Sequence, residues 1–492
     1  MFTIIFRTFL SLFFCLPLIS APKLQTLTST KGATIQAVVL KLEGDKVSLR
    51  RADGVSFQVS LGLFDEASRA KITGIGNQTG QGDSASTLRE TSGSPDIPFE
   101  KINEILGNPL FGDNLLWDDA PGDVASRLRW PGESSTETSQ SFRLYAPSNY
   151  KFAAARPYSA ALYGGSSSTS GVSLVFANKG DCFASAGAGE EHFKQGEVTK
   201  DPKVLASWIE RDEELITERM ESLLGKGRRQ NYGQGSAKRK VSRWDWSGHS
   251  FLLSVAEGDF VSLAVETIER ANARGKARKV ADMHIRRVHR ANVERRDNGD
   301  VVIGNIPMVD QGPKGYCVPA TFERCMRYME VPADMYLLAM AGSTGLGGGT
   351  HTPTLVESVQ KEVWSAGRTF KPLKSHPSFK ELMRFIDSGI PILWGLHSTE
   401  KFNRIANERT KERVGVSPGS WKETIKDASK EIKGFSKPHI SEARHICIIH
   451  GFNKETGEIA FTDSWGDRYK ERWIGADEAL HFSQNNCWVI EY

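Results

Sequence analysis

The sequence predicts a multidomain α+β protein with an N-terminal small β-barrel, a middle α+β domain and a C-terminal α+β domain. Three observations support this fold class. The chain has 492 residues, which is too long for one compact core. Short alternating β patterns near the N-terminus give way to a stretch rich in Gly, Ser and Thr, which is typical of a linker. Beyond that stretch, strand-like and helix-like patterns alternate.

The first residues are typical of a secretory signal peptide. MFTIIFRTFLSLFFCLPLISAPK has one positive charge, Arg7, ahead of an apolar run, which is followed by small residues at Ser20 and Ala21. We assign residues 1–21 to the signal peptide and expect no stable membrane anchor, because the apolar run is too short to span a bilayer. The mature chain is therefore expected to be secreted or periplasmic in a bacterium.

Residues 22–76 are expected to form the small β-barrel. Alternating apolar residues in ATIQAVVLKL, KVSLRR and VSFQVSL are separated by turns. In Gly32, Asp53-Gly54 and the closing SLGLFDEASRAKI, the segment resembles a small β-barrel module first described in an actin-cytoskeleton adaptor. The resemblance implies a docking module with a protein as its partner.

A flexible linker is expected at residues 77–98. An α+β domain is expected at 99–300, and the sequence does not indicate its function. Apolar residues at helical spacing predict a helix over 202–224. Residues 225–243, which end in AKRKVSR, are expected to form an exposed loop open to proteolysis. Residues 268–296 are expected to form a basic helix, solvated or between domains rather than bound to an anionic surface.

Composition and motifs exclude several classes of function. The net charge is only +4, so nucleic-acid binding has no support. The sequence contains no GxSxG, phosphate-loop, HExxH or CxxC motif. We therefore predict no cofactor and no metal.

The C-terminal domain, 301–492, contains the candidate chemistry, which begins with Cys317. The following VPATFERCMRYM predicts a helix whose inward stripe is Phe322, Met326 and Met329, so the thiol lies at a helix N-terminus. There the dipole and free N–H groups favour the thiolate. A buried structural thiol is the alternative. Five cysteines follow the signal peptide, an odd number that leaves at least one unpaired, and both bridged and fully reduced arrangements remain open.

The other groups that a thiol nucleophile needs are also present. Gln311 can place its amide beside the N–H of Cys317 to form an oxyanion hole. RHICIIHGF and EIAFTDSWGD predict a hairpin that brings Asp463 to His445, with Trp465 covering their hydrogen bond. Two further histidines, at positions 439 and 450, compete for the role of base but are interpreted as structural.

Taken in order, these pieces resemble a papain-like cysteine peptidase, in the branch of the bacteriocin leader-processing peptidases. The resemblance spans about residues 305–492 and implies a papain-like fold, a polypeptide substrate and the catalytic residues Cys317, His445, Asp463 and Gln311. It also implies that the glycine-rich segment pairs with substrate. The substrate-binding residues predicted in this way are Gly347, Gly348, Gly349 and Trp465.

The sequence also departs from that pattern. Val318 follows the nucleophile where Trp or Gly is usual, and residues 398–443 form a charged, partly helical insertion, interpreted as a lid or as decoration. Three classes of function remain: an exported thiol peptidase, which we prefer, a thiol acyltransferase or cell-wall amidase with the same triad, and a catalytically silent scaffold or adaptor. A further hypothesis is that a pro-segment before Gln311 blocks the cleft until the AKRKVSR segment is cut.

Overall fold

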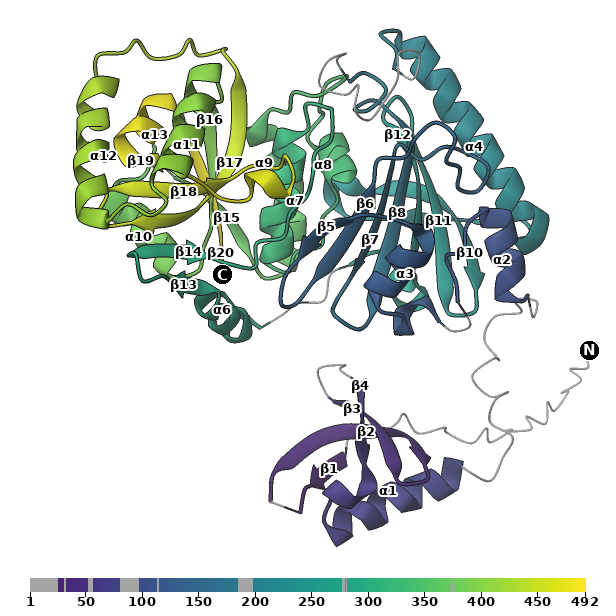
Figure 1. The fold of residues 1–492 in the computed structure, drawn as a ribbon. Helices are drawn as coiled ribbons and strands as arrows, with labels where there is room; N and C mark the ends of the chain where they lie inside the picture. Colours follow the sequence, from purple (N-terminus) through teal and green to yellow (C-terminus); the bar gives the residue numbers. More distant parts are fainter. Residues whose placement is uncertain are drawn as a thin grey trace, which may run out of the picture. The chain divides into compact units, whose positions relative to one another are not determined.

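The computed structural model describes residues 25–30, 32–51, 56–79, 97–112, 115–184, 198–276, 279, 281–373 and 375–492. The chain divides into two compact units, Met1–Gly93 and Ser94–Tyr492, which are described separately below. Several sheets and many helices confirm the multidomain α+β class (Figure 1). The expected signal peptide lies outside the described residues.

The smaller unit contains an antiparallel sheet and one long helix. Its strands pair in chain order: β1 (Gln25–Thr28), β2 (Thr34–Glu43), β3 (Lys46–Arg51) and β4 (Ser56–Ser60). A short turn of helix, η1 (Leu61–Leu63), leads into α1 (Glu66–Thr79), and the buried core includes Leu27, Val47, Leu49 and Ile72. An isolated bridge joins Ser29 to Phe64, but closure into the predicted barrel stays a prediction.

The larger unit begins with an eight-stranded antiparallel sheet, called the middle sheet below. Its order is β5-β6-β7-β8-β12-β11-β10-β9. The strands are β5 (Gly132–Ser135), β6 (Gln140–Leu144), β7 (Ser159–Gly164), β8 (Thr169–Asn178), β9 (Arg228–Tyr232), β10 (Arg239–Trp246), β11 (His249–Ala256) and β12 (Phe260–Thr267). The predicted helix over 202–224 is confirmed as α4 (Pro202–Leu224), which packs on this sheet beside α2 (Phe99–Leu106), while α3 (Pro121–Leu128) packs on β6 and β7.

Two expectations for this region are wrong. The loop expected at 225–243 forms β9, η3 (Gly235–Ala237) and β10, and Val241, Ser242 and Arg243 of the AKRKVSR segment are buried. A proteolytic nick there would have to open a paired strand. The basic helix expected at 268–296 is interrupted: α5 (Ile268–Asn272) ends before Gly275, which has φ of 71°, and α6 (Asp282–Ala291) is followed by strand β13 (Val293–Arg295).

A second sheet forms the C-terminal part, in the order β13-β14-β17-β16-β20-β15, with β18 paired to β17 and β19 to β18. Its further strands are β14 (Asp300–Ile303), β15 (Thr369–Leu373), β16 (Ile392–His397), β17 (Arg444–Asn453), β18 (Glu458–Thr462), β19 (Arg472–Gly475) and β20 (Ser483–Glu491). The expected hairpin is confirmed as β17 and β18. Strand β16 pairs with β17 on one side and with β20 on the other. The expected boundary at residue 301 falls inside β14, and the domain bounds stay a prediction.

Helices surround this sheet and reach the middle sheet (Figure 1). The first group is α7 (Cys317–Tyr328), α8 (Met335–Ala341) and α9 (Thr352–Ser365), and η3 of the middle region contacts α8 and α9. The others are α10 (Phe379–Asp387), α11 (Glu400–Glu412), α12 (Pro418–Ile432) and α13 (Ala476–Phe482). The insertion at 398–443 is thus partly helical, as predicted, and α11 packs on β19.

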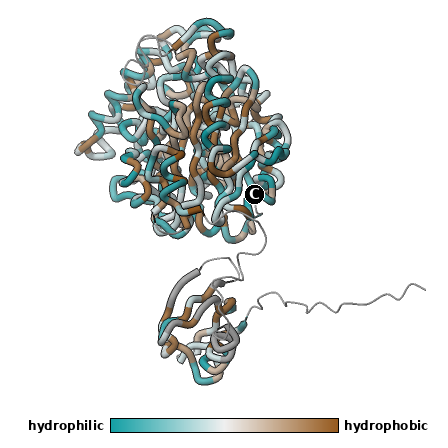
Figure 2. Tube along the Cα trace, turned by 90° about the vertical axis from the view of Figure 1, so that its right-hand side faces the viewer, coloured by the Kyte–Doolittle hydropathy of each residue, from teal (hydrophilic) through white to brown (hydrophobic). Residues whose placement is uncertain are grey.

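Apolar residues gather inside the larger unit, as the hydropathy colouring in Figure 2 shows. One core lies around the middle sheet and α4, and another around β16, β17, β20 and α7. Within the part of the chain that the structure describes, no helix is both long enough and apolar enough to cross a membrane.

Candidate active site

Cys317 is the first residue of α7, as predicted. The stripe Phe322, Met326 and Met329 is buried, so packing against the second sheet fixes where the helix begins. The Cys317 side chain is half-buried and hydrogen-bonds to His445. Backbone N–H groups of Val318 and Ile446 also stabilise its thiolate.

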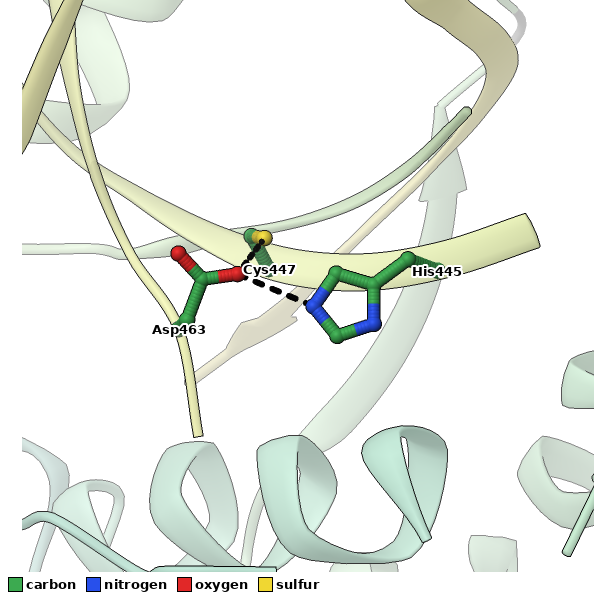
Figure 3. A group of neighbouring side chains, drawn as sticks. All are labelled: His445, Cys447 and Asp463. Atoms are coloured by element: carbon green, nitrogen blue, oxygen red, sulfur yellow. Dashed lines mark hydrogen bonds and ion pairs between the residues drawn. The ribbon is translucent and has the colours of Figure 1, made fainter. Parts of the chain in front are cut away.

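His445 lies on β17 and Asp463 directly follows β18, so the hairpin brings them together. His445 Nε2 and Asp463 Oδ1 are 2.9 Å apart, and Asp463 is fully buried (Figure 3). The indole of Trp465 stacks on the imidazole, with ring centroids 4.6 Å apart and an interplanar angle of 26°. The indole therefore covers the imidazole from solvent, as the sequence predicts.

The charged forms of Cys317 and His445 stabilise each other. Burial opposes ionisation of Cys317, but its hydrogen bond and electrostatic attraction to His445 lower the pKa of the thiol below its ordinary value. Burial also opposes the charged imidazole, yet its anionic and hydrogen-bonding neighbours raise the pKa of His445 well above its ordinary value. The structure therefore favours a thiolate–imidazolium pair over two neutral groups.

Asp463 has two further partners that the sequence analysis did not find. Arg472 donates to Asp463 Oδ2 from Nη2 at 2.6 Å and from Nε at 3.1 Å. The thiol of Cys447 lies 2.9 Å from Asp463 Oδ1 (Figure 3), and it is buried and free. Burial raises the pKa of Asp463, but these bonds together with His445 lower it to about 2.

Arg472 also connects this carboxylate to the insertion. Its Nη1 donates to the side-chain oxygens of Asn403 and Asn407 on α11, at 3.0 and 3.3 Å. One end of the insertion therefore holds the residue that orients Asp463. This contact differs from the lid interpretation, in which the insertion would act on the cleft directly.

Arg324 joins the nucleophile helix to the strand that carries Asp463. It is 1% exposed, and its guanidinium donates to the Asp463 carbonyl at 2.7 Å and to Thr462 Oγ1 at 2.7 Å. It donates as well to the Pro307 carbonyl at 2.9 Å. The relative position of α7 and β18 is therefore fixed by buried hydrogen bonds rather than by apolar packing alone.

Gln311 is buried beside the same segment. Its backbone N–H donates to the Ser464 carbonyl at 2.9 Å, and its side-chain Nε2 donates to the Lys314 carbonyl at 2.9 Å. Its Oε1 is buried without a hydrogen-bond partner. The amide is thus held between Ser464 and the loop that leads into Cys317.

Lys314 in that loop makes an ion pair with the middle region. Its Nζ lies 2.9 Å from Asp181 Oδ1, and both side chains are 0% exposed. Asp181 Oδ2 accepts hydrogen bonds from Asn178 and Tyr336, at 3.0 and 2.8 Å. Burial lowers the pKa of Lys314 despite the nearby Asp181 carboxylate. The middle region therefore supports the loop that positions Gln311.

The glycine-rich segment is also joined to the middle region. Gly347 N–H donates to the Lys179 carbonyl at 2.8 Å, and a bridge pairs Gly348 with Gly315. The N–H groups of Gly348 and Gly349 donate within the protein as well. A side chain at Gly348 is excluded, since its φ is 138° and a Cβ would lie 2.3 Å from the Gly315 Cα. The N–H groups of all three glycines, and the carbonyls of Gly347 and Gly349, are therefore engaged within the protein.

The two competing histidines lie apart from this group. His439 is exposed and bonds to Ser441 Oγ at 2.8 Å, while His450 is buried with Nδ1 3.3 Å from the Ile303 carbonyl. Burial lowers the pKa of His450 to about 4, so it is neutral at physiological pH. The hydrogen bonds of both residues go to other partners than Cys317, which fits the structural role expected for them.

Within the part of the chain that the structure describes, His445, Cys447 and Asp463 could hold a metal ion, since their donor atoms lie within 4.8 Å of one another. These atoms are already engaged: His445 lies between Cys317 and Asp463, and Arg472 occupies the second carboxylate oxygen. A cation would have to compete with a bidentate guanidinium in a buried position. The arrangement therefore fits a hydrogen-bonded triad better than a metal centre.

Long-range pairing explains which residues the sequence analysis missed. Arg472 reaches Asp463 because β19 pairs with β18 in a register that places Phe461 opposite Arg472. The loop between the two strands sets that register, and no pattern in the sequence predicts the register. Asp181 and Lys314 are 133 positions apart. Lys314 has an acid close by in sequence, at position 310, so nothing in the local pattern points to its partner Asp181.

The site places three groups in one line: a thiol at a helix N-terminus, an imidazole and a buried carboxylate. This is the arrangement found in hydrolases with a cysteine nucleophile. The sequence model of the Peptidase_C39 like family matches residues 303–489, which is less than half of the chain. This match supports a C39-like cysteine peptidase domain, and hence a polypeptide substrate, in that part of the chain. No curated protein matches the chain.

Proposed function

We propose that this protein is a papain-like cysteine peptidase that hydrolyses peptide bonds through Cys317, His445 and Asp463, with Gln311 as oxyanion donor. The observation that carries the proposal is the hydrogen-bonded line from Cys317 through His445 to Asp463. The match of residues 303–489 to the Peptidase_C39 like family supports the same reaction.

In the proposed reaction the Cys317 thiolate attacks the peptide carbonyl carbon. The negative charge that develops on the carbonyl oxygen is stabilised by the Gln311 amide and a backbone N–H at the start of α7. The C–N bond then breaks as the His445 imidazolium donates its proton to the leaving amine. A thioester remains on Cys317.

Water completes the cycle. Neutral His445 takes a proton from the water molecule, and the resulting hydroxide attacks the thioester carbonyl. The carboxylic acid product leaves, and Cys317 is released as thiolate beside imidazolium. Asp463 keeps the imidazole oriented and stabilises its charge through both halves of the reaction.

For the remaining parts we propose a location and a partner. The signal-peptide pattern of residues 1–21 supports export in a bacterium, so that the protein is secreted or periplasmic. The resemblance of residues 22–76 to a β-barrel adaptor module supports docking on a protein partner. Intact-mass measurement tests export. The exported protein should be lighter than its precursor by the mass of residues 1–21, and this difference should disappear when residues 1–21 are deleted.

A library of internally quenched peptides tests the reaction. We expect the wild-type protein to hydrolyse members of the library, Cys317→Ala to be inactive, and Cys487→Ala, which changes another buried free thiol, to retain activity. Intact-mass measurement should show an acyl adduct on Cys317. An adduct that passes to added amines but not to water would replace the peptidase with an acyltransferase, and equal hydrolysis by Cys317→Ala would overturn the proposal.

A further inference from the structure

The larger unit contains a cavity of about 610 Å³ that the proposed reaction does not use. It lies between the middle sheet and α6, α7 and α8, and it is lined by none of Cys317, His445 or Asp463. Its volume is within the range of small-molecule sites. We call it the sheet–helix cavity.

About half of the residues that line the sheet–helix cavity are apolar or aromatic. Val172, Val175 and Phe260 contribute from the middle sheet, and Val331 and Leu338 contribute from the opposite side. All five are buried residues of the hydrophobic cores. The body of a ligand that fills this space would therefore be apolar.

One cation in the cavity lacks a counter-ion. Arg239 on β10 lines it, and its Nε is buried without a hydrogen-bond partner. Its Nη1 donates to the Ala237 carbonyl at 3.2 Å, and the guanidinium lies over the Tyr232 ring at 5.2 Å. Within the described ranges of the chain, no carboxylate forms an ion pair with it. Burial lowers the pKa of Arg239, although Tyr232, Glu266 and Asp334 act in the opposite direction.

Two carboxylates act electrostatically on Arg239 and both are bound to other groups, whereas a third, Glu362, lines the cavity with both oxygens buried and without a hydrogen-bond partner. Glu266 accepts from the Tyr232 hydroxyl and pairs with Arg270 Nε at 3.3 Å. Asp334 caps α8 by accepting from the N–H of Tyr336 at 2.9 Å, and its other oxygen accepts from Ser173 Oγ at 3.2 Å. Neither is placed to satisfy the free Nε.

We propose that the sheet–helix cavity binds a small organic carboxylate with an apolar body, whose carboxylate pairs with Arg239. A guanidinium presents parallel N–H donors that match a carboxylate, and pairing would satisfy the buried Nε. The apolar body would lie against Val172, Val175 and Phe260. Because Met326 and Tyr328 of α7 also line the cavity, the ligand would contact the helix that begins with Cys317.

Binding of octanoate, with octanamide as its uncharged counterpart, tests this proposal by calorimetry and thermal unfolding. The full chain is compared with Arg239→Gln, which removes the cation, and with Lys240→Gln, which removes the exposed cation next to it on β10. We expect the wild type and Lys240→Gln to bind octanoate at least about ten-fold more tightly than octanamide. In Arg239→Gln this preference should disappear.

Three results would overturn the proposal. These are equal affinity of the wild type for octanoate and octanamide, no binding of either, and a carboxylate preference that persists in Arg239→Gln. The comparison of the two ligands on the wild type stands even if Arg239→Gln does not fold. Peptide hydrolysis is not part of the readout, so the result is independent of the proposed peptidase reaction.

Discussion

The two sides of the candidate active site are held by different parts of the chain. On the histidine side, Asp463 is fixed by Arg472 and Cys447, which belong to the same sheet as His445. On the glutamine side, the loop before Cys317 is fixed by the buried pair of Lys314 with Asp181, which follows β8 of the middle sheet. The C-terminal region therefore builds the line from Cys317 through His445 to Asp463 alone, whereas the loop that carries Gln311, the proposed oxyanion donor, is held by the middle region.

This difference assigns a role to the region whose function could not be read from sequence. A pro-segment that is cut and released would leave Lys314 buried without a counter-ion, which is costly. The pairing of residues 239–243 with β9, and the burial of the last three residues of the AKRKVSR segment, argue against cleavage there as well. The middle region is better explained as a permanent support of the oxyanion loop.

The largest effect is expected from Asp181→Asn, which leaves the Lys314 charge buried without its partner. Breaking a buried pair from one side costs about 3–5 kcal/mol of unfolding free energy, measurable by urea denaturation. The double variant with Lys314→Met should recover part of this loss, because it removes the orphaned charge. A loss below about 1 kcal/mol in Asp181→Asn would contradict the support role of the middle region.

A smaller effect is expected on acidification, through Asp463. Its pKa is lowered to about 2 in the folded protein, against about 3.9 for an unperturbed Asp. Because the folded pKa is the lower one, the stabilisation is complete above about pH 5 and is lost as the pH falls through 2, and it amounts to about 2.6 kcal/mol. Urea titrations across this range should show a shallower acid slope for Asp463→Asn. If the slope of the unfolding free energy against pH is the same in Asp463→Asn, other carboxylates cause the loss of stability in acid.

Replacing Arg472 by lysine should cost about 1.5–3 kcal/mol, because the charge remains but the bidentate hydrogen bond is lost. The imidazole would then be less well oriented, so kcat should fall while KM changes little. Arg468→Lys is the matched control, since Arg468 is exposed on the same connection. If the two variants lose the same stability and the same kcat, Arg472 does not orient Asp463.

The smallest effect is expected from Cys447→Ala. Burial raises the pKa of the Cys447 thiol to about 12, so it remains protonated and can donate to Asp463. Loss of this weak donor and of the sulfur volume should cost about 1 kcal/mol. Cys447→Ser keeps a donor and should retain more activity than Cys447→Ala, as kcat measurements would show; the reverse order would show that only volume matters at this position.

These contacts also show how far a sequence can predict such a site. The start of α7, the hairpin of β17 and β18 and the stacking of Trp465 on His445 follow from local patterns, and the structure agrees with them. Arg472, Asp181 and the split of the basic segment into α5 and α6 depend on strand register and tertiary contacts. Local periodicity contains no information about those.

The central claim is that Cys317 is a thiolate paired with protonated His445, and its alkylation rate tests this most directly. Labelling by iodoacetamide is followed by mass spectrometry from acidic to mildly basic pH, in the wild type and in His445→Ala. We expect Cys317 to react well below the unperturbed thiol pKa of about 8.5, and more slowly at the same pH once His445 is removed. A Cys317 profile that tracks an ordinary thiol, and that does not change in His445→Ala, would contradict the account.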